Sequence, residues 1–484
     1  MRLNFIKPFV PYLPEVKGPA FAPTLKEKLI WTGAVLALFF IMYHIIPFGA
    51  ILSGGSFIEF IQVVLASKTG TLLTVGIGPI ILASILLQLL AGAKIIEVDF
   101  SNQEDKANFS ATQKVLAIAL AFIESALFVL PEAYLTPISI FGLPTSFALL
   151  LVVFQVAFAS IILLLLDEVV SKYGIGSGIS LFIAAGVSLA IVQGSLVLFF
   201  GGGGLEESLT VIGVLKEQSA TVIASVILTV LPLIFTFVIM LLSVYAENVR
   251  VEIPLAFDRI RGFGSRFPVK LLYVSVLPVI LTSAMFVNIQ LLSRGFLANA
   301  EFMIGDVNIV PLIGYVGPNG YLQDGLLYLM TSSFSNPLFI GYNAYLAVLA
   351  GSTPLFGIPE FIHIIIYAVT YITLCVFFGK FWIEAAGMAP SDIADQITKT
   401  GMQIPGFRRD PRIIKRVLEK YISTITIIGS IFVGFLAVFA DLTGAIGSGT
   451  GVLLTVSIVQ KFYEDLKRQK LFETYSGLQG LFGS

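Results

Sequence analysis

The sequence predicts an all-α membrane protein of ten transmembrane helices, divided into two five-helix halves of opposite orientation in the membrane. Three observations predict this class. Of the 484 residues, 57% are hydrophobic and only 12% are charged, whereas soluble domains carry about 25% charged residues. Apolar runs of about twenty residues, each long enough to cross a hydrocarbon core about 30 Å thick as a helix, recur along the chain. The Lys and Arg residues fall almost entirely into alternate loops.

Charged or Gly/Pro-rich breaks separate the apolar runs and set the limits of the spans. The predicted spans cover residues 29–47, 71–91, 113–131, 145–166, 178–200, 220–244, 270–292, 360–383, 420–440 and 444–465. The first 25 residues contain five prolines and scattered lysines, and they lack the compact apolar core and small-residue cleavage site of a signal peptide. We therefore expect the N-terminus to be retained.

The distribution of basic residues orients these spans. Of the 29 Lys and Arg residues, 26 lie on one predicted side, and only Lys68, Lys216 and Arg294 lie on the other. A single missed or invented helix would invert every later loop, so this asymmetry supports the count of ten. Because basic loops face the cytosol, we expect cytosolic termini and long cytosolic loops near residues 245–270 and 384–418.

A short segment after the first span does not fit a simple crossing. Residues 56–66, SFIEFIQVVLA, form about three helical turns, which is too short to cross a bilayer. Short elements at membrane depth are tolerated only where protein or a water-filled cavity shields them. The segment is therefore either a half-helix that enters the protein interior or an amphipathic helix on the membrane surface.

A glycine run, Gly201–Gly204, divides the chain into two halves. Five spans lie in residues 1–200, a linker covers 201–218, and five spans lie in 219–484. Because each half has an odd number of spans, a repeated half must be inverted in the membrane. In proteins built from inverted halves, the functional path commonly lies between them.

Few side chains in the spans are suited to catalysis. His44 and His363 are the only histidines and Cys375 is the only cysteine, and none of them lies in a metal-ligand or nucleophile motif. The glycine-rich stretches 174–178 and 447–451 lack the Lys-Ser/Thr that follows a phosphate-binding loop. We predict no enzyme activity, no cofactor and no metal.

Ionisable residues within the spans are also few, namely Glu124 in the third span and Asp441 at the end of the ninth. A proton or sodium relay normally needs a chain of such residues across the membrane. An ion-coupled secondary transporter remains the alternative function, because some transporters bind ions through backbone carbonyls alone.

Three long blocks identify a family. They are residues 71–98 (TLLTVGIGPIILASILLQLLAGAKIIEV), 167–186 (DEVVSKYGIGSGISLFIAAG) and 449–459 (GTGVLLTVSIV). In content and order they closely resemble the SecY family, especially its archaeal branch and its endoplasmic-reticulum counterpart, and the resemblance runs essentially end to end. The family forms a passive channel that passes secretory polypeptides across the membrane and releases hydrophobic segments sideways into lipid.

The resemblance implies a central pore between the halves, closed by a plug near residues 56–69 that is the half-helix after the first span. Gly54, Gly55 and Gly70 are the expected hinges of the plug. The plug residues would be Glu59, Phe60, Ile61, Gln62, Val63, Val64, Leu65, Ala66, Ser67, Lys68 and Thr69.

The resemblance also implies a lateral gate, with the second and third spans on one side and the seventh and eighth on the other. Glu124 and Asn288 match a polar cluster behind this gate, whereas Leu82 stands where some relatives carry a threonine. The alternative for Glu124 and Asn288 is a purely structural interhelical hydrogen bond, worth about 1 kcal/mol in membranes.

A ring of apolar side chains that constricts the pore is a further implication of the resemblance. Such constrictions can block ions by dewetting, and residues spaced i, i+4 lie on one face of a helix. Isoleucine serves ordinary packing equally well, so the assignment depends on the family. The ring residues would be Ile77, Ile81, Ile179, Ile183, Ile280 and Leu454.

Finally, the resemblance implies that the basic cytosolic loops dock the ribosome, although positive-inside topology alone also produces many of these charges. The expected partners are a single-span subunit of the SecE type, a small β subunit, the ribosome, the signal recognition particle receptor, nascent polypeptides and the lipid of an archaeal cell membrane. No function is predicted for the external stretch 293–358. The ribosome-binding residues would be Arg250, Arg259, Arg261, Arg266, Arg408, Arg409 and Arg412.

Overall fold

Ten long helices, in the part of the chain that the computed structural model describes, correspond one to one to the ten predicted spans. The described residues are 13–21, 23–52, 66–92, 95–96, 98, 103–129, 135–137, 144–201, 210–216, 222–257, 264–271, 277–297, 303–304, 307–317, 322–331, 342–385, 388–399, 402–403 and 411–482. The ten helices are α1 (Leu25–His44), α3 (Gly78–Gly92), α4 (Gln103–Val129), α5 (Thr145–Tyr173), α6 (Gly178–Phe200), α8 (Val222–Asn248), α9 (Leu277–Leu297), α14 (Glu360–Ala385), α16 (Pro411–Leu442) and α17 (Gly449–Phe482).

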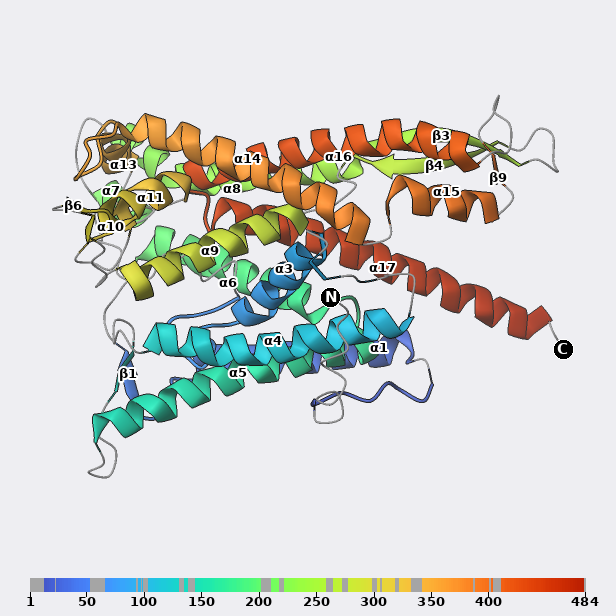
Figure 1. Cartoon of the computed structure of the whole chain (residues 1–484), viewed down its shortest axis with the longest axis horizontal. Helices are drawn as coiled ribbons and strands as arrows, with labels where there is room; N and C mark the ends of the chain where they lie inside the picture. Colours follow the sequence, from blue (N-terminus) through green and yellow to red (C-terminus); the bar gives the residue numbers. More distant parts are fainter. Residues whose placement is uncertain are drawn as a thin grey trace.

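The helices lie roughly along the long axis of the molecule, which gives it two ends (Figure 1). In the first half, α4 packs against α3 and α5, and α1 packs against α5; in the second half, α14 packs against α9 and α16, and α8 packs against α17. The halves meet where α3 contacts α9 and where α6 contacts α17. By length and composition, six of the helices can cross a membrane, and the described parts of α3 and α9 are shorter apolar helices.

One end of the bundle carries the two long basic loops, and we call it the basic end. The first loop is a hairpin of β3 (Arg250–Phe257) and β4 (Gly264–Lys270), and β9 (Met402–Gln403) of the second loop pairs with β3. The second loop also contains α15 (Pro390–Lys399), which packs against α16. The two loops predicted separately from charge are therefore joined by one three-stranded antiparallel sheet.

The opposite end, on the left of Figure 1, is built mainly from the stretch 293–358. It contains only short elements: β5 (Met303–Ile304), β6 (Val307–Asn308), α10 (Val310–Ile313), β7 (Tyr315–Val316), β8 (Leu322–Asp324), α11 (Leu326–Met330) and α13 (Tyr342–Leu349). A further pair, β1 (Ala50–Leu52) and β2 (Leu135–Pro137), joins the loops after the first and third spans. The predicted linker 201–218 contains α7 (Val211–Lys216), which packs against α6 and α8.

Several helices differ in length from the apolar runs that predicted them. The second span was predicted from residue 71, but residues 71–77 are turns and α3 begins at Gly78. The backbone amide of Leu72 donates to the carbonyl of Ile45 at the end of α1, and Gly76 has a φ of +59°, which a right-handed helix does not accept. Conversely, α16 begins at Pro411 rather than 420, because Ile414, Leu418 and Ile422 continue an apolar stripe that packs against α15.

The helix pairs α5–α6 and α16–α17 are joined by matching turns. Each turn contains the triplet Gly-Ser-Gly, at 176–178 and at 447–449, and the first glycine of each has a positive φ, +73° at Gly176 and +76° at Gly447. The last glycine of each triplet begins the second helix of its pair, against the preceding helix. A Cβ on Gly178 would lie 2.5 Å from Asp167 Cα, and one on Gly449 would lie 2.1 Å from the Ala440 carbonyl carbon.

A carboxylate from the preceding helix caps the second helix in both turns. Asp167 Oδ1 accepts hydrogen bonds from the amide of Ile179 at 2.9 Å and from the hydroxyl of Ser177 at 3.2 Å. Asp441 Oδ1 accepts from the amide of Thr450 at 3.2 Å and from its hydroxyl at 2.7 Å. The two turns occupy corresponding positions, fourth to fifth span and ninth to tenth, and they therefore supply a local sequence signature of the repeated halves.

Candidate functional site

The six residues of the predicted ring lie on, or immediately before, four helices that meet between the two halves. Five of them are buried, at 0–8% exposure, and the sixth, Ile179, is partly buried. All six lie in, or pack against, one continuous hydrophobic cluster. Their positions are Ile77 just before α3, Ile81 on α3, Ile179 and Ile183 on α6, Ile280 on α9 and Leu454 on α17.

Hydrogen bonds fix the start of α3 and with it the position of Ile77. The Ile77 carbonyl accepts from the amides of Ile80 and Ile81, at 3.1 and 3.2 Å, so Ile77 is the residue that precedes the first helical turn. The hydroxyl of Ser160, on α5, donates to the Gly76 carbonyl at 3.0 Å inside the protein. The turn before α3 is therefore held by α5, and Ile77 and Ile81 remain one helical turn apart.

The described end of the predicted plug packs against the ring helices. Ala66 is fully buried within the same hydrophobic cluster, and its Cα lies 3.6 Å from the position that a Cβ on Gly186 would occupy. Lys68 Nζ lies 5.2 Å from the centre of the Tyr43 ring on α1, within the range of a cation–π contact. Burial lowers the pKa of Lys68. Plug residues 59–65 and the hinges at 54 and 55 lie outside the described residues.

Glu124 and Asn288, predicted for the gate, lie on neighbouring helices and do not hydrogen-bond each other. Glu124 on α4 and Asn288 on α9 are both buried, at 3% and 5% exposure. Asn288 donates to the Ala284 carbonyl of its own helix at 2.8 Å, and neither carboxyl oxygen of Glu124 has a hydrogen-bond partner among the described residues. Leu82 is partly buried on α3. Close to this site, Phe128 of α4 and Val287 of α9 belong to one apolar cluster.

At the basic end, three of the seven predicted ribosome-binding residues fall in described elements. Arg250 begins β3, Arg266 lies on β4, and Arg412 is exposed in the first turn of α16. Further along the extension of α16, the side chains of Lys415, Arg416 and Lys420 are also exposed. Arg259, Arg261, Arg408 and Arg409 lie outside the described residues.

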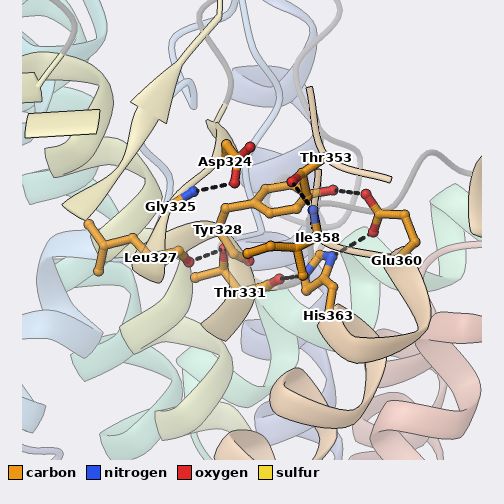
Figure 2. A network of polar contacts seen from close by, with 9 residues as sticks. All are labelled: Asp324, Gly325, Leu327, Tyr328, Thr331, Thr353, Ile358, Glu360 and His363. Atoms are coloured by element: carbon orange, nitrogen blue, oxygen red, sulfur yellow. Dashed lines mark hydrogen bonds and ion pairs between the residues drawn. The ribbon is translucent and has the colours of Figure 1, made fainter. Parts of the chain in front are cut away.

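The stretch 293–358, for which the sequence predicted no function, contains a buried polar network (Figure 2). Asp324, fully buried at the end of β8, accepts from the amides of Leu355 and Phe356, at 2.9 and 2.8 Å. In the first turns of α14, Glu360 accepts from the hydroxyl of Tyr328 on α11 at 2.9 Å. The network therefore fastens the N-terminal end of α14 to the loops that cover it.

His363 completes this network. Its Nε2 lies 2.9 Å from the Thr331 carbonyl and its Nδ1 lies 2.9 Å from Glu360 Oε2. Because a carbonyl only accepts, Nε2 carries a hydrogen, and one further hydrogen lies between Nδ1 and the Glu360 carboxyl group. Burial of the ring and, after it, the proximity of Glu360 raise the pKa of Tyr328.

Comparison with known proteins decides the family. The SecY family profile matches residues 71–463. The protein translocase subunit SecY of Methanocaldococcus jannaschii is 42% identical over 476 residues, covering 98% of each chain, and that of Methanococcus vannielii is 39% identical, covering 99% of each. The chain belongs to the SecY family.

Solved SecY-family structures share the fold. One, of a protein-conducting channel, superposes with a TM-score of 0.75 at 41% identity and covers 96% of this chain and 97% of that one. Another, the channel of a canine ribosome–channel complex from the endoplasmic reticulum, gives 0.73 at 41% identity with the same coverage. The chain is thus a multi-pass membrane protein and the protein-conducting subunit of a translocase. The prediction that it is not an enzyme is confirmed, and the transporter alternative is not supported.

The sequence alone did not lead us to predict three features of this chain. The pairing of β3 with β9 joins residues almost 150 positions apart, and no local pattern marks it. The Asp324–Glu360–His363 network likewise joins distant residues, although a histidine in an apolar span was a visible signal. The repeated Gly-Ser-Gly triplets were visible in the sequence, and an aspartate before each triplet was the signal that would have paired them.

Proposed function

We propose that Ile77, Ile81, Ile179, Ile183, Ile280 and Leu454 form the constriction through which this channel subunit passes an extended polypeptide. The observation that carries the proposal is that all six contribute to one apolar cluster at the contact between the halves. An apolar constriction excludes ions by dewetting and yet offers a translocating chain no fixed polar partner. The ring therefore accounts for both a resting seal and a tolerance of many sequences.

The test is ion conductance of the reconstituted complex in planar bilayers. Replacing Ile81, Ile183 and Ile280 together with serine should raise the resting conductance at least several-fold, because the constriction becomes wettable. The matched control replaces three isoleucines that are exposed on the outside of the bundle. These are Ile162, Ile227 and Ile365, at 44%, 55% and 57% exposure. Equal conductance of the ring variant and the wild type, also after deletion of the plug, would exclude this ring.

We further propose that residues 56–69 are the plug and that it seats on α6. Support comes from the packing of buried Ala66 close to Gly186, one turn after Ile183. Lateral release of hydrophobic segments would occur between α3 and α4 on one side and α9 and α14 on the other. Glu124, Asn288 and Leu82 line that seam in the proposal. The apolar cluster that contains Phe128 of α4 and Val287 of α9 keeps the seam closed.

The basic end is the proposed docking surface for the ribosome. Arg250, Arg266 and Arg412, with Arg259, Arg261, Arg408 and Arg409, supply cations that pair with phosphates of ribosomal RNA. The channel of the canine ribosome–channel complex, 41% identical to this chain, supports this partner. Binding should weaken steeply between about 50 and 200 mM salt through counterion release, and an affinity independent of salt would contradict the proposal. The signal recognition particle receptor would use the same end.

The remaining proposals concern assembly and location. A single-span subunit of the SecE type and a small β subunit would bind the outside of the bundle, where α8 exposes apolar side chains such as Ile223, Phe237 and Tyr245. The protein would lie in the cell membrane of an archaeon with both termini and the basic end in the cytosol. Residues 1–200 and 219–484 would act as the two halves, joined by the linker 201–218.

A further inference from the structure

The base of the β3–β4 hairpin brings two cations face to face. Arg250, two residues after the end of α8, is the cross-strand partner of Lys270, the last residue of β4. Like charges directly opposite each other destabilise an antiparallel pair. The hairpin base therefore requires an anion from elsewhere in the protein.

That anion comes from α17. Lys270 Nζ donates to both carboxylate oxygens of Glu464, at 2.8 and 3.0 Å, and Arg250 Nη2 lies 4.0 Å from Glu464 Oε1. One helical turn earlier on α17, the Gln460 amide donates to Asn248 Oδ1 at 3.4 Å. Two polar contacts on one face of α17 thus hold the junction between α8 and the hairpin.

The same helix forms part of the pore wall. Leu454 of the proposed ring precedes Glu464 by ten residues on an uninterrupted α-helix, which corresponds to about 15 Å along its axis. This helix packs against α6 and α8. Figure 1 shows α17 as one long helix. A displacement of the hairpin base can therefore reach Leu454 through a single element.

We propose that Glu464 is a positioning residue that couples the β3–β4 hairpin to α17, so that a ribosome docked on the hairpin shifts Leu454 and loosens the pore constriction. This inference rests on the proposed ribosome docking and on the proposed ring. Glu247, at the end of α8, is a second carboxylate that acts on Lys270, and it also interacts with Ser457 of α17. The hydrogen bonds of Lys270, however, go to Glu464, so Glu464 is the direct contact between the hairpin base and α17.

A charge swap tests the coupling in the complete complex reconstituted into proteoliposomes. Glu464→Lys places a third cation at the hairpin base, Lys270→Glu places a second anion there, and the double variant restores an opposite-charge pair. The readouts are ribosome affinity, resting ion conductance, and the conductance increase on adding ribosomes that carry a signal-bearing nascent chain. The matched control is Asp465→Lys, which makes the same charge change at the next residue of α17.

The proposal predicts that Glu464→Lys keeps ribosome affinity and resting conductance within about two-fold of the wild type but reduces the ribosome-dependent increase about ten-fold. The double variant should recover at least half of the increase, and Asp465→Lys should keep it. An unchanged increase in Glu464→Lys overturns the coupling. A reduced increase that the double variant fails to restore also overturns it. A reduction in ribosome affinity as large as the reduction in the conductance increase overturns it too, because Glu464 would then only stabilise the shape of the hairpin. Wild-type complexes that bind no ribosomes would instead refute the docking on which the inference rests.

Discussion

Replacing Glu360 with alanine removes the acceptor that Tyr328 and His363 share at the N-terminal end of α14. The hydroxyl of Tyr328 and Nδ1 of His363 each lie 2.9 Å from a Glu360 oxygen, and both side chains are buried. Each buried polar group left without a partner costs about 1–3 kcal/mol. We therefore expect Glu360→Ala to destabilise the protein by about 2–6 kcal/mol.

Glu360→Gln is the matched control. A glutamine at this position offers its carbonyl oxygen to the Tyr328 hydroxyl and its N–H to Nδ1 of His363, and His363 Nε2 continues to donate to the Thr331 carbonyl. Every hydrogen bond of the network then has a donor and an acceptor. We expect this change to cost less than about 1 kcal/mol, because only the net difference between satisfied hydrogen bonds is lost.

The single cysteine of the chain provides the assay. Cys375 lies on α14, fully buried in the main hydrophobic cluster, so a thiol-reactive dye labels it only when the bundle opens. In a thermal ramp of the purified complex, the labelling midpoint should fall by about 2–6 °C for Glu360→Ala and stay close to the wild type for Glu360→Gln. Equal midpoints for the two variants would refute the reasoning.

Three further predictions concern close packing, the pore seal and ribosome docking. Gly178→Ala should destabilise the protein by about 1–3 kcal/mol, because the new Cβ would lie 2.5 Å from Asp167 Cα, whereas Gly33→Ala, with nothing within 4 Å, should not destabilise it in the same labelling assay. Gly186→Leu should raise the resting ion conductance, because the larger side chain displaces Ala66 and the plug end, while Gly186→Ala, at an ordinary contact distance of 3.6 Å, should remain sealed. Ribosome binding measured by co-sedimentation should fall steeply with added salt, and a flat salt profile would show that the basic loops serve topology alone.

Hydropathy and charge were enough to predict the ten spans, because the bilayer imposes length and composition on each helix. They did not predict the helix ends that depend on individual hydrogen bonds, backbone angles or packing partners. Residues 71–77 are mostly apolar, and hydropathy therefore included them in the second span. They form turns rather than helix, because the amide of Leu72 hydrogen-bonds to the carbonyl of Ile45 and Gly76 has a positive φ. Helix α16 begins before the apolar run that predicted it, because Ile414 and Leu418 pack against α15.

The candidate site was predictable only through the family. Isoleucines occur throughout the chain, so an i, i+4 spacing does not separate Ile179 and Ile183 from ordinary packing, and the resemblance supplied the choice. Hydrogen-bond partners were less predictable still. Asn288 donates to the Ala284 carbonyl of its own helix rather than to Glu124 on α4, because side-chain partners depend on atomic positions that a sequence pattern does not specify.

The central claim, that a polypeptide passes through the apolar ring, is tested most directly by site-specific photocrosslinking. A photoreactive residue is placed at Ile81, Ile183 or Ile280, or at the exposed control positions Ile162 and Ile227, and a ribosome-bound secretory chain is stalled halfway through the complex. The account predicts adducts between the stalled chain and each of the three ring positions, and none at the two controls. Adducts of equal yield at the control positions, or a stalled chain that is protected from protease but does not crosslink to the ring, would contradict it.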